Sequence, residues 1–175
     1  LRAPPLAPQA RLEELERASL GRCIKRWQAA GVSREEALRL AKDRDVGGVE
    51  PALWPSKEAP VIVWTAAMGS GKSISAERFH QDSVATALVQ DGAPVPVYLE
   101  ASLVLPDLEE AVRSRSAEIG DPRTCGTDIV VDGVDELGHD GAGLLLDQAR
   151  ALAETWPNTR VLIVSRPMRS LKEAE

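Results

Sequence analysis

An apolar run, Val-Ile-Val-Trp at positions 61–64, is followed almost at once by the small-residue segment AAMGSGKS at positions 66–73. This pattern predicts a buried strand, a tight glycine loop and a helix that opens at Gly71 or Lys72. Small residues let the backbone of such a loop wrap around an anion, with successive N–H groups pointing inward. The first helical turn adds unpaired N–H donors and a partial positive charge. The stretch therefore restricts the chain to folds in which a strand delivers a glycine loop to a helix N-terminus.

These residue types predict a site for the phosphates of a nucleotide. Lys72 is placed to reach the β- and γ-phosphates, and the Ser73 hydroxyl is placed to bind Mg²⁺. The predicted nucleotide-binding residues are Ala67, Met68, Gly69, Ser70, Gly71, Lys72, Ser73 and Ile74. The usual pattern is G-x-x-x-x-G-K-[ST], and Ala66 stands at its first glycine. Alanine keeps the turn if its φ is negative, whereas a positive φ costs roughly 1 kcal/mol or more. The alternative is a glycine-rich strand-to-helix connection that binds no ligand.

Composition narrows the class of protein. A chain of 175 residues has room for one domain of ordinary size, and its apolar content of 43% is enough for a packed core. Only 3% of the residues are aromatic, so we expect an aliphatic core. A net charge of −6 argues against direct binding to nucleic acid.

The sequence also bears on location. No run of 18 or more apolar residues is present, so we expect no membrane span in this segment, and no signal peptide is visible. The two cysteines, Cys23 and Cys125, are isolated and suit a reducing interior, where we expect them to be packing residues. We therefore expect a cytoplasmic protein.

The first 50 residues read as a linker followed by a helical prefix. Residues 1–10 contain three prolines and are expected to be a linker, while apolar spacing predicts a helix over residues 11–30. A capping-box pattern at residues 33–36 predicts a second short helix that runs to about Asp43. Gly47 and Gly48 break that helix, and residues 46–60 form a connector. The prefix either packs on the following domain or ends an upstream module, and the sequence leaves both open.

From position 61 onward, apolar strands alternate with helices. We expect strands at residues 61–64, 95–99, 127–132 and 160–165, and helices from the glycine loop to about 90, over 107–120 and over 142–156. Pro96 favours an edge position for the second strand. Strands that are apolar on both faces indicate a parallel sheet covered on both sides, which is a three-layer α/β domain over residues 51–175. The chain begins at Leu1 and stops just after the predicted start of a helix, so we expect a piece of a longer protein whose domain is incomplete at its C-terminus.

Charged residues follow two of the predicted strands. Asp132 comes directly after an apolar run and is placed to hold Mg²⁺, together with Ser73. Asp135 or Glu136 is then a candidate to orient or deprotonate an attacking water. Arg166 follows the fourth strand and is a candidate to sense the γ-phosphate and stabilise charge during transfer. Because ligands of such sheets bind beyond the carboxyl ends of the strands, these residues are expected at one edge. The alternatives are a polar loop for the acidic residues and a salt-bridged surface arginine.

Together these segments resemble the NACHT group of STAND nucleotide-switch ATPases. The similarity rests on GSGKS at 69–73, DGVDEL at 132–137 and VSRP at 164–167, and it covers roughly residues 55–170. Most related ATPases have a glutamate directly after the first aspartate, whereas Gly133 stands there in this chain. Ala66 and Ile74, the latter where threonine is frequent, are further departures, and neither removes a donor.

The resemblance implies a P-loop fold with strand order 1-4-3-2. It implies a domain that binds ADP at rest, exchanges it for ATP and hydrolyses ATP slowly with Mg²⁺. It also implies self-oligomerisation of the full-length protein and activation of an attached effector, as in signal transduction, innate immunity or anti-phage defence. By position, the resemblance implies that Lys72 and Ser73 bind the phosphates and Mg²⁺ and that Asp132 binds the Mg²⁺. It implies that Asp135 or Glu136 acts on the attacking water and that Arg166 senses the γ-phosphate.

Other functions share the glycine loop. A small-molecule kinase needs clustered arginines on a lid, for which Arg113 and Arg115 are the nearest candidates. A GTPase is disfavoured because no N-K-x-D-type segment follows the third motif. A nucleotide-dependent binding module with negligible hydrolysis has the same sequence features as a slow ATPase, so this alternative stays open.

Overall fold

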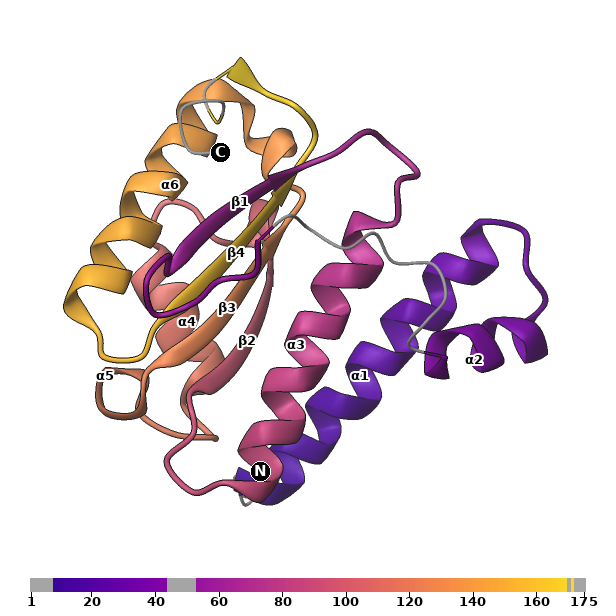
Figure 1. Ribbon diagram of the computed structural model, residues 1–175, viewed down its shortest axis with the longest axis horizontal. Coiled ribbons are helices and arrows are strands. Elements are labelled where there is room, and N and C mark those ends of the chain that lie inside the picture. Colours follow the sequence, from indigo (N-terminus) through magenta and orange to yellow (C-terminus); the bar gives the residue numbers. More distant parts are fainter. Residues whose placement is uncertain (1–7, 44–52, 170, 172–175) are drawn as a thin grey trace, which may run out of the picture.

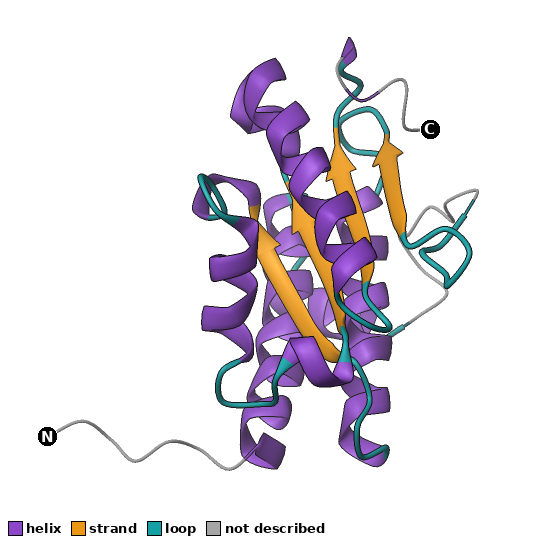
Figure 2. Cartoon of the chain, turned by 90° about the vertical axis from the view of Figure 1, so that its left-hand side faces the viewer, coloured by secondary structure: helices purple, strands orange, loops and turns teal. Residues whose placement is uncertain are grey.

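The computed structural model describes residues 8–43, 53–169 and 171, which form an α/β structure around one parallel sheet (Figure 1). The strands are β1 (Val61–Thr65), β2 (Val95–Glu100), β3 (Thr127–Asp132) and β4 (Arg160–Ser165). All neighbouring strands pair in parallel, in the order β1-β4-β3-β2. Figure 2 shows the four strands side by side and pointing the same way. The predicted strands and the order implied by the resemblance are confirmed.

The edge strand β2 explains the tolerance for a proline inside the sheet. Pro96 is opposite Asp128 of β3, and β2 has no strand on its other side within the described residues. A proline lacks the N–H that a central strand needs for its second ladder, so the edge position avoids that loss.

Helices lie on both faces of the sheet (Figure 1). One face packs against α4 (Leu108–Ser116) and α6 (Gly138–Thr155), and this side holds the larger apolar core. The other face packs against α3 (Lys72–Val89), where Ala76 and Phe79 contact the sheet. Successive strand residues alternate between these two cores, as the period of a strand requires: Val131 and Ile163 belong to the first, Val130 and Leu162 to the second.

Helix α1 (Pro8–Ala29) runs beside α3 and is followed by α2 (Arg34–Lys42) (Figure 1). The predicted cap of α2 is confirmed, because the Ser33 side chain accepts a hydrogen bond from the N–H of Glu36. Asp107 caps α4 in the same way through Glu110. The prefix therefore packs on the α/β part, which the sequence left open.

Several predicted boundaries were wrong. α1 begins at Pro8, so residues 8–10 are helical rather than linker, since a proline fits the first helical position without losing a hydrogen bond. α6 begins at Gly138, directly after the short 3₁₀ helix η2 (Val134–Leu137). α4 ends at Ser116, and a short helix α5 (Pro122–Cys125), capped by Asp121, follows it. The predicted breaks at Gly47 and Gly48 and the linker at residues 1–7 lie outside the described residues.

A buried carboxylate joins α1 to α3. The Glu77 side chain is fully buried and accepts hydrogen bonds from Ser19 Oγ at 2.6 Å, Arg22 Nε at 2.5 Å and Arg26 Nη1 at 2.7 Å. Burial by itself raises the pKa of the Glu77 carboxyl, but the hydrogen bonds from Arg22, Ser19 and Arg26 outweigh burial and hold that pKa below its ordinary value. Glu77 is therefore charged at neutral pH, and its charge is matched by the α1 arginines.

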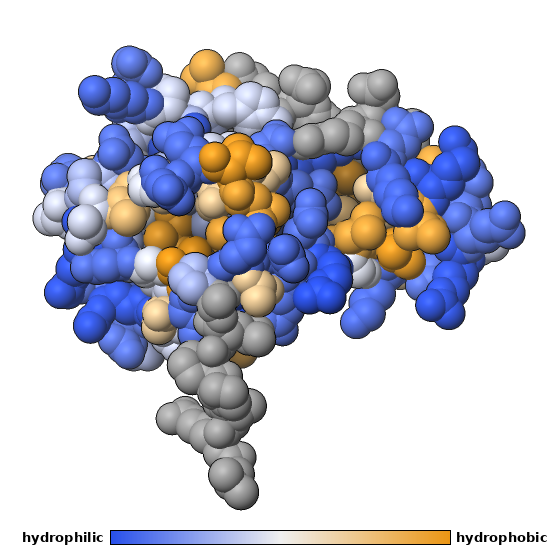
Figure 3. Space-filling view, turned by 90° about the horizontal axis from the view of Figure 1, so that it is seen from below, coloured by the Kyte–Doolittle hydropathy of each residue, from blue (hydrophilic) through white to orange (hydrophobic). Residues whose placement is uncertain are grey.

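Polar residues predominate on the lower face of the molecule. Seen from below, it is largely hydrophilic with apolar residues gathered in a few patches (Figure 3). Cys23 is buried, Cys125 is partly exposed and neither forms a disulfide, as expected of packing residues. Within the described ranges, no helix combines the length and apolarity needed to cross a bilayer.

Gly126 occupies a position that no other residue fits. Its φ is +86°, and an added Cβ would lie 2.2 Å from the carbonyl oxygen of Pro157. We expect Gly126→Ala to lower the free energy of unfolding by about 3 kcal/mol, because left-handed strain and a backbone clash add together. Gly92 also has a positive φ but has open space around it. We expect Gly92→Ala to lower the free energy of unfolding by only about 1 kcal/mol. Urea denaturation of both variants measures the two losses of stability, and equal losses would contradict the clash at Gly126.

His80 makes the stability depend on pH. Its ring is buried against Tyr98, and neither ring nitrogen has a hydrogen-bond partner within the described residues. Burial is the main cause that lowers the pKa of His80 to about 4. The negative charge of Glu77 opposes this shift, and the positive charge of Arg22 adds to it. Between that value and the unfolded pKa of about 6.5, only the unfolded chain takes up the proton, so stability is lost as the pH falls.

We expect His80 to contribute about 2 kcal/mol to the loss of unfolding free energy between pH 7 and pH 5. Guanidinium denaturation at both pH values, for the wild type and for His80→Phe, measures this contribution as the difference between the two pH dependences. Other titrating groups are common to both proteins and cancel. An identical pH dependence would show that the imidazole is not held neutral.

Candidate functional site

A pocket of about 270 Å³ opens at the carboxyl edge of the sheet. It lies where β2, β3 and β4 end and where α3 begins, and the last turn of α1 also reaches it. The residues that line it are Arg26, Lys72, Ser73, Glu100, Ser102, Asp132, Gly133, Asp135, Glu136 and Arg166. All the predicted catalytic and metal-binding residues are in this set, together with the lysine of the glycine loop.

The glycine loop joins β1 to α3 as predicted, and two of its glycines need their conformational freedom. Gly69 has a φ of +79° and Gly71 a φ of +87°, values that favour glycine. Lys72 Nζ donates to the carbonyl oxygen of Ala67 at 3.4 Å, across the loop. Of the eight predicted loop residues, Lys72 and Ser73 line the pocket, while Ala67, Met68, Gly69, Ser70, Gly71 and Ile74 do not.

Ala66, the departure from the usual loop pattern, fits its position without strain. Among the described residues, Asn158 is the only non-glycine with a positive φ, so Ala66 keeps a negative φ. Its N–H donates to the carbonyl oxygen of Ser165 at 3.2 Å, which continues the pairing of β1 with β4 by one residue. The first glycine position directly follows β1 and has a negative φ in this chain, so alanine is accommodated there without backbone strain.

Asp132 ends β3 and faces the start of α3. Its Oδ1 accepts from Ser73 Oγ at 3.3 Å, which brings together the two residues predicted to bind Mg²⁺. Its Oδ2 accepts from the Tyr98 hydroxyl at 2.8 Å and from Arg26 Nη2 at 3.2 Å. One carboxylate oxygen thus faces the glycine-loop serine, and the other is held from β2 and α1.

Gly133 explains why no acidic residue directly follows Asp132. Its φ is +81°, and its N–H donates to the carbonyl oxygen of Val164 on β4 at 3.1 Å. A side chain is strained in this left-handed conformation, so the turn requires glycine. The acidic pair, Asp135 and Glu136, begins two residues later on η2, and both residues line the pocket.

The two candidates for activating water differ in their contacts. Asp135 Oδ1 accepts from the backbone N–H of Arg166 at 3.0 Å, and Oδ2 lies 3.3 Å from Arg166 Nε. The Glu136 side chain lines the pocket but makes no hydrogen bond or ion pair with the described part of the chain. The structure therefore separates a paired carboxylate, Asp135, from an unpaired one, Glu136, where the sequence treated them alike.

Arg26, Glu100 and Ser102 line the pocket but were not predicted from the sequence, and neither was Tyr98, which supports Asp132. Arg26 belongs to the helical prefix, and its position beside Asp132 depends on how α1 packs on α3. Tyr98 is the only tyrosine of the chain and lies on β2, with its hydroxyl on Asp132. A tyrosine in a strand is ordinarily read as a packing residue, so its spacing carries no signal for this role. Arg22 and Arg26 recur one helical turn apart, which is the only sequence hint of a paired role.

The arginines considered for a kinase lid lie elsewhere. Arg113 pairs with Glu110 on α4, both half-exposed or more, and neither Arg113 nor Arg115 lines the pocket. The pocket itself carries three cationic and four acidic side chains: Arg26, Lys72 and Arg166 against Glu100, Asp132, Asp135 and Glu136.

The protein oxygens at this site suit a metal ion whose other ligands are phosphate oxygens and water. Across the described ranges, no group of three or more His, Cys, Asp or Glu side chains is arranged to hold a metal ion. Mg²⁺ is commonly bound through one or two protein oxygens together with phosphates and water, and the Ser73–Asp132 pair supplies such oxygens.

Comparisons with known proteins add no relative: no family model matches the chain, and neither a curated protein nor a solved structure matches it.

Proposed function

We propose that this chain is the Mg²⁺-dependent, ATP- and ADP-binding P-loop domain of a larger NACHT-type switch protein, with slow ATPase activity. The observation that carries the proposal is the pocket in which Lys72, Ser73 and Asp132 meet, with Ser73 Oγ and Asp132 Oδ1 3.3 Å apart. A glycine loop, a helix N-terminus and a strand-end carboxylate are the parts that phosphate and Mg²⁺ require.

In this proposal Lys72 binds the β- and γ-phosphates, and its present contact with the Ala67 carbonyl is exchanged for them. Ser73 and Asp132 hold the Mg²⁺. A Mg²⁺ ion held there would supply positive charge opposite the phosphates during transfer. The strand order β1-β4-β3-β2 supports a P-loop fold, because it is the order that the resemblance to the NACHT group implies.

The contacts of the acidic pair favour different roles for its two members. Glu136 has a free carboxylate in the pocket and is our choice for orienting the attacking water. Asp135 holds the backbone and side chain of Arg166, and so sets where this arginine meets a γ-phosphate. Because Arg166 is engaged by Asp135, its charge is partly neutralised, which fits slow hydrolysis.

The same pairing favours a second candidate, a nucleotide-dependent binding module with negligible hydrolysis. In that case Arg166 exchanges Asp135 for the γ-phosphate, and the resulting movement of η2 changes what the domain packs against. Under both candidates we propose ADP at rest, exchange for ATP and self-oligomerisation of the full-length protein, acting in signal transduction or defence. The positions of Arg113 and Arg115 do not favour a small-molecule kinase.

Lys72→Ala tests the phosphate site. We expect it to weaken ATP binding at least about 100-fold in calorimetric titration, because a charge-assisted contact to the phosphates is lost. The matched control is Lys57→Ala, which removes an exposed lysine outside this pocket and should leave the affinity unchanged. Wild-type ATP affinity in Lys72→Ala would refute the assignment of this loop.

Glu136→Gln and Asp135→Asn separate the two acidic roles. We expect Glu136→Gln to lower steady-state turnover of Mg²⁺-ATP at least about tenfold with little change in ATP affinity, since it removes only the group that orients water. Asp135→Asn should instead change the ratio of the dissociation constants for ATP and ADP, because it releases Arg166. Both proteins are compared in a phosphate-release assay and by titration. The reverse pattern would exchange the two roles, and a wild type that binds ATP without turnover would favour the binding module.

A further inference from the structure

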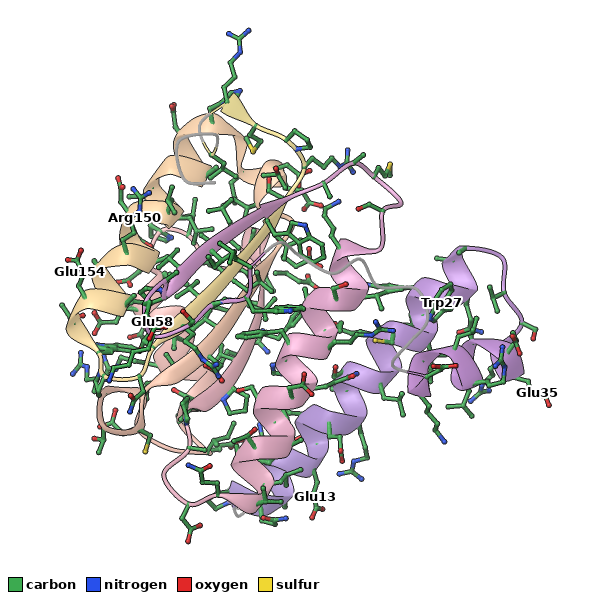
Figure 4. All side chains as sticks on the ribbon, viewed as in Figure 1. Glu13, Trp27, Glu35, Glu58, Arg150 and Glu154 are labelled. Atoms are coloured by element: carbon green, nitrogen blue, oxygen red, sulfur yellow. The ribbon has the colours of Figure 1, made fainter. Side chains whose placement is uncertain are left out.

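One guanidinium connects the helical prefix to α3 and to β3, two elements whose ends meet at the pocket. Arg26 lies in the last turn of α1, just before Trp27, which Figure 4 labels on the part of α1 that lies toward the start of α3. Its Nη1 donates to Glu77 of α3 at 2.7 Å. Its Nη2 donates to Asp132 of β3 at 3.2 Å and to the Tyr98 hydroxyl at 2.9 Å. The side chain therefore spans the helix that begins with Lys72 and Ser73 and the strand that ends with Asp132.

These contacts fix the orientation of Asp132. Oδ2 accepts from two donors, Tyr98 and Arg26, so the carboxylate cannot rotate without breaking both hydrogen bonds. Oδ1 is left toward Ser73 and the pocket. Groups that hold a metal-binding carboxylate through its second oxygen set its direction, and their removal typically weakens metal binding about 10- to 100-fold.

The support behind Arg26 is itself fixed. Ser19 and Arg22 bind the same Glu77 carboxylate, and the Arg22 guanidinium lies 4.4 Å from the centre of the Tyr98 ring. Glu77 is fully buried, and the Arg26 side chain is about 29% exposed. Breaking a charge-assisted hydrogen bond to a buried carboxylate costs more free energy than breaking a surface ion pair. Arg26 therefore stays in place as long as α1 packs on α3.

We propose that Arg26 is a positioning residue through which the docking of α1 and the binding of Mg²⁺-nucleotide are coupled. Docked α1 keeps Asp132 aimed at the cation and adds a positive charge to a pocket wall with four acidic side chains. Undocking of α1 releases Asp132 and weakens binding. Because coupling is reciprocal, bound Mg²⁺-nucleotide stabilises the docked helix by the same factor. The prefix is thus a regulatory element of the site, an inference that rests on the proposed function.

The chain offers a matched pair of variants. Arg22 and Arg26 both come from α1 and both bind Glu77, but Arg26 alone of the two reaches Asp132 and lines the pocket. We would titrate the wild type, Arg26→Gln and Arg22→Gln with ADP, with and without Mg²⁺. Mg²⁺ is expected to raise the affinity of the wild type for ADP. We expect this gain in affinity to be about tenfold smaller in Arg26→Gln. Arg22→Gln removes two hydrogen bonds to Glu77 but leaves the bonds from Arg26 to Glu77 and Asp132 in place, so it should keep that gain within about twofold of the wild type.

Hydrogen exchange on the wild type tests the reciprocal effect without any variant. Amides in the second half of α1 should exchange more slowly when Mg²⁺ and ADP are both present than with ADP alone. This measurement does not depend on how well either glutamine variant folds.

The outcomes separate the two proposals. A wild type that binds neither ADP nor ATP refutes the proposed function and this inference with it. A wild type whose ADP binding depends on Mg²⁺, with equal losses or no loss in the two variants, refutes the role of Arg26 and leaves the proposed function standing. Unchanged exchange in α1 on adding Mg²⁺ to the ADP-bound protein also refutes the coupling. A selective loss in Arg26→Gln with protection of α1 supports it.

Discussion

The candidate site depends on the geometry of parallel strands, whose carboxyl ends all meet at one edge of a sheet. β1 delivers the glycine loop there, β3 delivers Asp132 and β4 delivers Arg166. Because β4 lies between β1 and β3, the backbone of β4 receives hydrogen bonds from the residues that follow both neighbours: Ala66 donates to Ser165 and Gly133 donates to Val164. The central strand therefore sets the distance between the loop and the carboxylates, and the Ser73–Asp132 contact follows from that spacing.

The ionic network around Glu77 extends this geometry to the prefix. A fully buried carboxylate is unfavourable unless it is paired, and here Arg22 and Arg26 supply the pairing from a different helix. As a result, the packing of α1 on α3 and the orientation of Asp132 use the same side chain, Arg26. This shared residue is the physical reason to treat the prefix as part of the site rather than as an attached segment.

Local sequence patterns predicted the elements well, because apolar runs, caps and glycine turns are determined over a few residues. The strand at residues 160–165, the cap at Ser33 and the helix start at Lys72 are examples. The pocket residues on strand ends were also predictable, since the parallel sheet brings them together. The contacts of Arg26, the unlike environments of Asp135 and Glu136, and the burial of His80 were not predictable, because each depends on which helix face packs against which neighbour. Residue spacing contains no information about that packing.

The most direct test of the account is calorimetric titration of the purified chain with ATP and with ADP, each with and without Mg²⁺, after removal of any nucleotide carried through purification. We predict that both nucleotides bind at about one per chain, and that Mg²⁺ strengthens binding about tenfold or more through Ser73 and Asp132. Absence of binding by both nucleotides would contradict the phosphate-site assignment. Binding that is indifferent to Mg²⁺ would contradict the role given to the Ser73–Asp132 pair.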